Sequence, residues 1–149
     1  MNLNSWKIGL AMSAGLMAMA ALSSQAAIAA PVKYKAVLAA AAEVPATTSK
    51  GKGEADVTYD AATKKLTWTV MYSDLTGPAT ASHFHSPASP TENAKPTVPL
   101  SGDLKSPMKG EATLTDALAK DLTDGKMYFN IHTGANPGGE IRGQVVVAK

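Results

Sequence analysis

The three histidines of the chain have a spacing that suits metal coordination. His83 and His85 occupy alternate positions of the run SHFH, and His132 lies in the run YFNIHT. Because side chains alternate across a β-strand, His83 and His85 point to one side and Phe84 to the other. Histidines two residues apart are about 6.5–7 Å apart at the backbone, and their imidazoles converge on one ion when a neighbouring strand supplies a third. Three neutral imidazoles form a candidate site for copper or zinc.

The hydrophobic neighbours of the histidines predict which side of the sheet they occupy. Phe84 is expected in the core, which turns both histidines of its run outward, toward solvent or under the segment that follows. The same alternation places Phe129 and Ile131 inside. The outward residues of that second run are then Tyr128, Asn130 and His132.

A charged pair is predicted on the next strand. The turn GANPGG joins the His132 run to EIRGQVVV, which should fold back antiparallel. The residues expected to point inward are Ile141, Val145 and Val147. Those expected on the outer face with His132 are Glu140, Arg142 and Gln144. Glu140 and Arg142 would form an ion pair or orient an imidazole, and the plainer alternative is an exposed cross-strand pair worth less than ~1 kcal/mol.

The remaining sequence predicts an all-β domain. Turn residues recur about every ten residues, and the runs between them alternate with period two, as in antiparallel sandwiches and barrels. GEADVTY and LTWTVMY, for example, form a hairpin with one apolar face. We therefore expect an antiparallel β-sandwich or barrel of seven or eight strands. Its predicted core includes Trp68, Val70, Phe84, Phe129, Ile131 and Val145.

Two segments depart from the alternation. TDALAKDLTDG places leucines at intervals of four, which predicts a short helix capped by Thr115 or Asp116 and closed by Gly125. The segment SPASPTENAKPTVP carries four prolines. Proline lacks a backbone donor, so this segment is predicted to be a long loop directly after His85 rather than a central strand.

The amino-terminal residues have the pattern of a secretory signal peptide. Lys7 is followed by an apolar run over residues 8–22 and by small residues with A-x-A-like cleavage points. We assign residues 1–29 to the signal peptide and 31–149 to the domain. The alternative is an uncleaved anchor, but the run is alanine-rich and short of the ~20 residues of a membrane span.

The composition agrees with a bacterial periplasmic or secreted protein. The chain has no cysteine, so it must hold itself together by packing. Its formal charge of +2 comes from interspersed acidic and basic residues, which does not indicate nucleic-acid binding. No membrane association is expected after signal cleavage.

The sequence resembles the CHRD domain in the runs GPATASHFH and GEATLT, and above all in YFNIHT followed by NPGGEIRGQ. This domain is named after chordin and is also found singly in exported bacterial proteins. The resemblance implies an immunoglobulin-like or superoxide-dismutase-like β-sandwich. The family's histidines fall on His83, His85 and His132, and its acidic and basic pair falls on Glu140 and Arg142. The three histidines also resemble half of the copper site of copper–zinc superoxide dismutases. The fourth histidine, the bridging imidazole, the zinc cluster and the cysteine pair are lacking, so dismutase activity is not expected.

Three functions are compatible with these residues. The first is a non-catalytic exported binding module that holds copper or zinc through the histidines. The second is a structural or protein-interaction domain whose partner the sequence does not identify. The third and weakest is an enzyme, because no Ser-His-Asp or Cys-His constellation can be assembled and no carboxylates are paired for acid–base work. The only activity that remains is a metal-dependent redox reaction at the same three histidines.

Overall fold

The computed structural model describes residues 29–149, so the predicted signal peptide lies outside the described residues except for Ala29. Nine strands, one α-helix and one short 3₁₀ helix make up this part of the chain. In chain order they are β1 (Val32–Ala39), η1 (Ala40–Ala42), β2 (Lys52–Asp60), β3 (Lys65–Ser73), β4 (Ala79–His85), β5 (Pro96–Pro99), β6 (Met108–Thr113), α1 (Asp116–Thr123), β7 (Tyr128–Thr133), β8 (Ile141–Gln144) and β9 (Val146–Val147).

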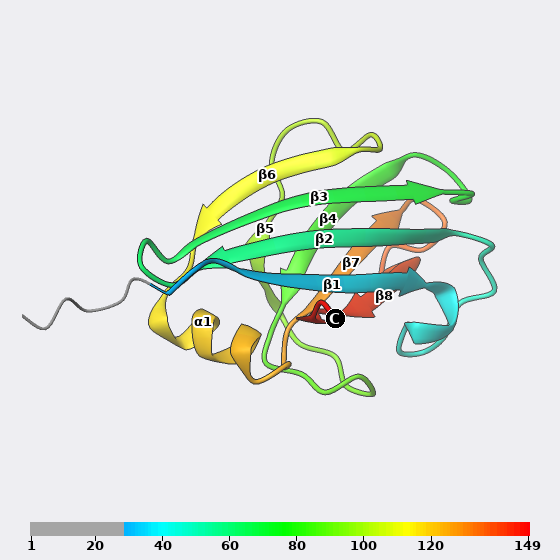
Figure 1. Cartoon of the computed structure of the whole chain (residues 1–149). Coiled ribbons are helices and arrows are strands. Elements are labelled where there is room, and N and C mark those ends of the chain that lie inside the picture. Colours follow the sequence, from blue (N-terminus) through cyan, green and yellow to red (C-terminus); the bar gives the residue numbers. More distant parts are fainter. Residues whose placement is uncertain (1–28) are drawn as a thin grey trace, which may run out of the picture.

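All strands pair antiparallel in one sheet of order β5-β4-β7-β8-β1-β2-β3-β6, with β9 added beside β1. The sheet curls into a nearly closed barrel, with β6, β3, β2 and β1 in one layer and β5, β4, β7 and β8 in the layer behind it (Figure 1). The predicted all-β class, the antiparallel pairing and the single short helix are confirmed. The structure has nine strands where seven or eight were expected, and the additional strand is the two-residue β9.

The hydrophobic core lies between the two layers. All six predicted core residues are buried, and Phe84 and Phe129 are both completely inaccessible to solvent. The Phe84 ring packs edge-on against Trp68, with ring centroids 5.1 Å apart, and against Phe129 at 4.9 Å. Such aromatic pairs add about 0.5–1.5 kcal/mol beyond the area they bury. Because Phe84 faces this cluster, its neighbours His83 and His85 face away from the core.

The predicted short helix is confirmed as α1, which connects β6 of the first layer to β7 of the second. The Thr115 side chain caps its start by accepting a hydrogen bond from Leu118 N at 3.3 Å. Gly125 follows its end with a φ of 70°, a conformation that glycine adopts without strain. Leu122 is buried and Leu118 packs partly against the core. The helix therefore delivers the chain from β6 to the start of β7.

The sheet ends in two strands that differ from the central ones. The proline-rich segment forms a loop over residues 86–95 and then β5, which pairs only with β4 and contains Pro96 and Pro99. The other edge is β6, which pairs only with β3 and carries Lys109 and Glu111. The prediction that the proline-rich segment is not a central strand is confirmed.

The prediction that Val147 points inward is wrong. Val145 is completely buried, but Val147 is 56% exposed. The alternation that runs through β8 ends at Val145, where the chain leaves β7 and continues as β9 alongside β1. Counting by two is valid only within one continuous strand, so the break removes Val147 from the core.

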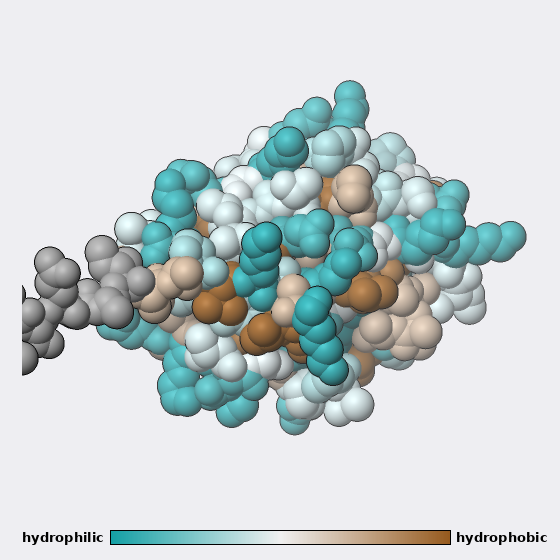
Figure 2. All heavy atoms as spheres, viewed as in Figure 1, coloured by the Kyte–Doolittle hydropathy of each residue, from teal (hydrophilic) through white to brown (hydrophobic). Residues whose placement is uncertain are grey.

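The outer face of the β1–β2–β3 layer is mixed in polarity. Figure 2 shows hydrophilic side chains lying between separate hydrophobic ones on this face. Lys35 and Glu54 pair across it at 2.8 Å, while Val37 and Met71 are exposed. No helix among residues 29–149 is long and apolar enough to cross a membrane.

Candidate metal centre

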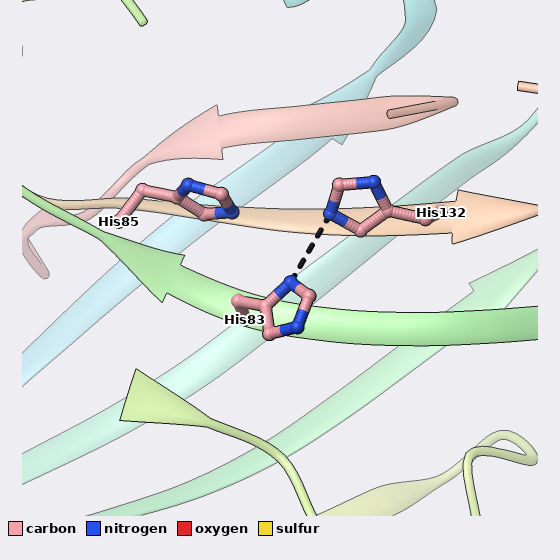
Figure 3. A group of neighbouring side chains, drawn as sticks. All are labelled: His83, His85 and His132. Atoms are coloured by element: carbon pink, nitrogen blue, oxygen red, sulfur yellow. Dashed lines mark hydrogen bonds between the residues drawn. The ribbon is translucent and has the colours of Figure 1, made fainter. Parts of the chain in front are cut away.

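The structure brings the three predicted histidines together on the outer face of the second layer. β4 and β7 are paired neighbours, with His83 opposite Asn130 and Ala81 opposite His132. One ring nitrogen from each histidine lies within 4.8 Å of those of the other two. The three rings turn toward one another across the strand pair (Figure 3). Nitrogens bound at about 2.1 Å to one tetrahedral or trigonal ion lie about 3.4–3.6 Å apart, so the widest pair would close by roughly 1 Å on binding.

Two of the histidines are oriented by backbone carbonyls. His85 Nδ1 lies 2.9 Å from Ala94 O, and His132 Nδ1 lies 2.9 Å from Pro137 O. A carbonyl only accepts, so each Nδ1 carries the proton and each Nε2 has a free lone pair in the neutral ring. Carbonyl contacts of this kind fix the ring and tautomer of metal-binding histidines.

The third histidine, His83, is hydrogen-bonded to His132 across the strand pair. His83 Nδ1 lies 3.2 Å from His132 Nε2, and because that Nε2 has no proton, His83 Nδ1 donates to it. A metal ion at this position would replace the bridging hydrogen, and His83 would then carry its proton on Nε2. The side chain of His83 is only half-buried, so solvent can exchange that proton.

His85 has a nitrogen without a partner. Its side chain is 5% exposed, and its buried Nε2 forms no hydrogen bond with any group of residues 29–149. Leaving a buried polar atom unpaired costs about 1–3 kcal/mol. Burial lowers the pKa of His85 to about 4, and it lowers the pKa of His83, with a further contribution from the nearby His132. Both rings are therefore neutral at physiological pH, the form in which imidazole binds a metal.

An aromatic and a guanidinium group are stacked behind His85. The Tyr128 ring lies parallel to His85, with centroids 4.6 Å apart and an interplanar angle of 7°. Arg142 Cζ lies 4.0 Å from the centroid of the Tyr128 ring. Arg142 is 2% exposed, so the guanidinium is held inside the protein. The three side chains form a stack that fixes the plane of the His85 ring.

The proline-rich loop covers this stack. Arg142 donates to Asn93 Oδ1, Pro90 O and Glu92 O, each at 2.9 Å. Gln144 Nε2 donates to Ala88 O at 2.9 Å and to Gly125 O at 2.7 Å. The outer face of β7 and β8 is therefore buried and polar. Of the two positions expected for the histidines, solvent or the segment that follows, His85 occupies the second.

The predicted pairing of Glu140 with Arg142, and the alternative of an exposed surface pair, are both wrong. Glu140 is completely buried, and its carboxylate accepts hydrogen bonds from Thr76 N at 2.7 Å and from Thr76 Oγ1 at 2.6 Å. Ser49, Thr133 and Asn136 donate to it as well. Glu140 precedes β8 and follows Gly139, whose φ is 132°, so the alternation of the strand does not extend to it.

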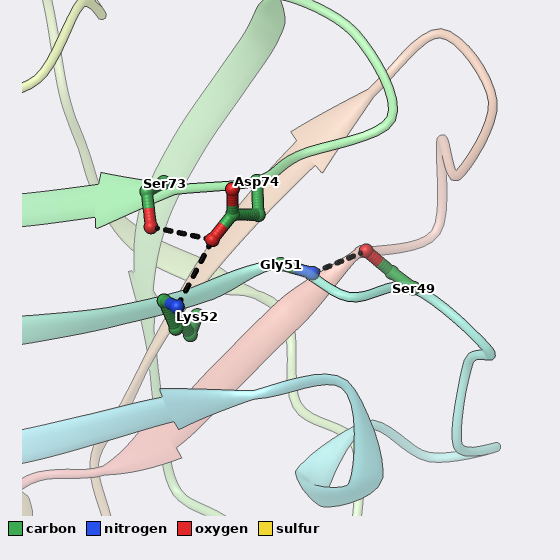
Figure 4. A network of polar contacts seen from close by, with 5 residues as sticks. All are labelled: Ser49, Gly51, Lys52, Ser73 and Asp74. Atoms are coloured by element: carbon green, nitrogen blue, oxygen red, sulfur yellow. Dashed lines mark hydrogen bonds and ion pairs between the residues drawn. The ribbon is translucent and has the colours of Figure 1, made fainter.

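Glu140 joins three loops at one end of the barrel. Burial would raise the pKa of Glu140, but the hydrogen bonds from Ser49, Thr133 and Thr76 together lower it to about 2. Contacts next to it hold the same end, where Ser49 Oγ accepts from Gly51 N at 2.8 Å and Lys52 pairs with Asp74 at 3.1 Å (Figure 4). The residue therefore anchors loops, and among residues 29–149 it forms no hydrogen bond or salt bridge with Arg142 or the histidines.

A buried carboxyl group near the site was missed by the sequence reasoning. Glu43 is 7% exposed and accepts a hydrogen bond from Asn130 Nδ2 at 2.7 Å. Burial raises the pKa of Glu43 to about 7, although the charge of Arg142 and the Asn130 hydrogen bond act in the opposite direction. The sequence does contain a signal, because Glu43 is the one charged residue of the apolar stretch AAAAEVPA.

Fold and site together define an antiparallel β-barrel domain with a three-histidine cluster and no disulfide framework. Residues 34–145 match the CHRD domain family, and the chain belongs to it. No curated protein and no solved structure matched the chain. Family and site support a binding or structural domain.

Proposed function

We propose that the chain is an exported, non-catalytic CHRD-domain protein that binds a transition metal ion, copper or zinc, through His83, His85 and His132. The observation that carries this proposal is the unpartnered, buried Nε2 of His85, which lies with the nitrogens of two other imidazoles. Imidazole suits copper and zinc, and three protein nitrogens leave a coordination position for water or another ligand.

The burial of His85 within the cluster favours a metal over a protein partner. If the histidines were a recognition patch for another protein, all three would have to be accessible. His85 is 5% exposed and lies under the loop that follows it, so a partner would reach only part of the cluster. A metal ion, by contrast, needs only the nitrogens that face inward.

Metal titration of the tag-free mature protein tests the proposal. The wild-type chain should bind copper or zinc with one equivalent at saturation, and replacing any one histidine by alanine should weaken binding by at least tenfold. Thr80→Ala, an exposed change on the same strand β4, is the matched control and should bind as wild type does. Equal affinity of the wild type and the triple alanine variant would overturn the metal site.

Export is supported by the sequence pattern of residues 1–29. The mature protein should be periplasmic or secreted and should begin within a few residues of Ala27 or Ala30. Amino-terminal sequencing of the protein from cell fractions tests this. Recovery of a chain that still begins at Met1 from the membrane fraction would overturn it.

A further inference from the structure

The stack behind His85 places a fixed positive charge beside the proposed metal site. Arg142 Cζ is 4.0 Å from the Tyr128 centroid, and Tyr128 is 4.6 Å from His85, so the guanidinium lies roughly 10 Å from an ion bound at His85 Nε2. The Tyr128 ring lies between the guanidinium and the His85 ring and excludes water from the direct path between the two charges.

No carboxylate of residues 29–149 forms a salt bridge with Arg142. Its three hydrogen-bond acceptors are two backbone carbonyls and the amide oxygen of Asn93. None of the salt bridges found among residues 29–149 includes Arg142. Neutral acceptors stabilise a guanidinium group without cancelling its net charge.

Glu43 is the carboxyl group that interacts electrostatically with Arg142. Burial raises the pKa of Glu43 to about 7, so a large share of this carboxyl group is protonated near neutral pH. The remaining ionised fraction offsets the positive charge of Arg142 only in part. The ligands themselves supply no negative charge, because all three are imidazoles. The surroundings of the site are therefore net positive.

Resting on the metal site proposed above, we infer that Arg142, through its stack on Tyr128 and His85, makes the site selective for monovalent copper over divalent copper and zinc. Each unit of positive charge on the bound ion is repelled by the guanidinium. At roughly 10 Å and an effective dielectric constant of about 20, the second unit of charge lowers affinity by about tenfold. A d¹⁰ Cu(I) ion also accepts three-coordinate nitrogen ligation without a further anionic ligand.

Competition titrations on the purified mature protein test this selectivity. Affinities for Cu(I), measured without oxygen, and for Cu(II) and Zn(II) are compared in the wild type, Arg142→Met and Arg142→Lys. Arg142→Met should shift the Cu(I)-to-Cu(II) affinity ratio about tenfold toward Cu(II), which corresponds to a fall of about 60 mV in the copper potential. Arg142→Lys keeps the charge and should change the ratio by less than about threefold. Loss of packing alone would weaken all ions alike and leave the ratio unchanged.

A second variant decides the question if Arg142→Met does not fold. Glu43→Gln removes a negative charge that interacts with Arg142 while keeping an oxygen to accept from Asn130. Measured near pH 8.5, where Glu43 is ionised in the wild type, this change should move the ratio further toward Cu(I). The inference is overturned if folded Arg142→Met keeps the wild-type ratio, or if Glu43→Gln leaves it unchanged when Arg142→Met is unfolded. If the wild type binds none of the three ions, the metal site itself fails, and the selectivity with it.

Discussion

Replacing Glu140 by glutamine should destabilise the domain in a pH-dependent way. The carboxylate is completely buried and accepts hydrogen bonds from four side chains and one backbone amide. The pKa of Glu140 is about 2 in the folded chain, against an ordinary value of 4.5. A difference of this size corresponds to about 3 kcal/mol of stability from the ionised form.

The sign of the pH dependence follows from the lowered pKa. The stabilisation is present in full above pH 4.5 and is lost as the pH falls through 4.5 toward 2. Once protonated, wild-type Glu140 resembles glutamine, so the two proteins should converge in acid. In Glu140→Gln the amide oxygen can still accept from Thr76 N, but the amide nitrogen faces the nitrogen of Asn136 and cannot accept from it.

Urea unfolding of both proteins near pH 7, 4.5 and 3 measures the difference. We expect Glu140→Gln to be less stable by about 3 kcal/mol near pH 7 and by much less near pH 3. The matched control is Glu111→Gln, the same change in an exposed carboxylate that pairs with Lys65 at 3.0 Å. It should cost less than about 1 kcal/mol. If Glu140→Gln loses no more than this control, or if its loss does not shrink in acid, the hydrogen-bonded carboxylate does not stabilise the loops.

Three further predictions concern the core, the second buried acid and the metal site. Phe129→Ala should lower the free energy of unfolding by about 3–5 kcal/mol in urea, and a loss under about 1 kcal/mol would contradict its place in the core. Glu43, with its pKa raised from 4.5 to about 7, destabilises the fold as the pH rises through this range, so Glu43→Gln should raise stability by up to about 3 kcal/mol near pH 8.5 and have little effect near pH 4. Protons should compete with metal at low pH, but His85 stays neutral to about pH 4, so between pH 6 and 5 metal affinity should fall by no more than about a hundredfold. A thousandfold fall would show that His85 gains a proton in this range.

Period-two alternation was sufficient to predict the side on which each histidine lies. The rule works for His83, Phe84 and His85 because β4 pairs with β7 in unbroken register from Ala81 to His85. It also placed His132 on the same face, because β7 is continuous through it. The proximity of the three rings could be predicted only as a possibility, since the sequence does not state which strands are neighbours.

The environment of the charged residues could not be predicted in the same way. Glu140 is bound by groups from three separate loops, and no periodicity relates Ser49, Thr76 and Asn136 to one another. Arg142 was placed correctly on the outer face, but alternation cannot show that the proline-rich loop covers that face. Whether a loop covers a strand depends on contacts between residues far apart in the sequence. Such a loop buries a side chain that alternation alone would place at the surface.

The two edges of the sheet have a consequence for the behaviour of concentrated protein. An exposed edge strand is a template onto which a second chain can add, the first step of β-aggregation. Here one edge, β5, is four residues long and contains Pro96 and Pro99, which have no amide hydrogen to donate to an added strand. The other edge, β6, carries Lys109 and Glu111, and in a parallel, in-register stack of copies each of these charges would lie beside a like charge. An open barrel built in this way resists growing into fibrils although its sheet never closes on itself.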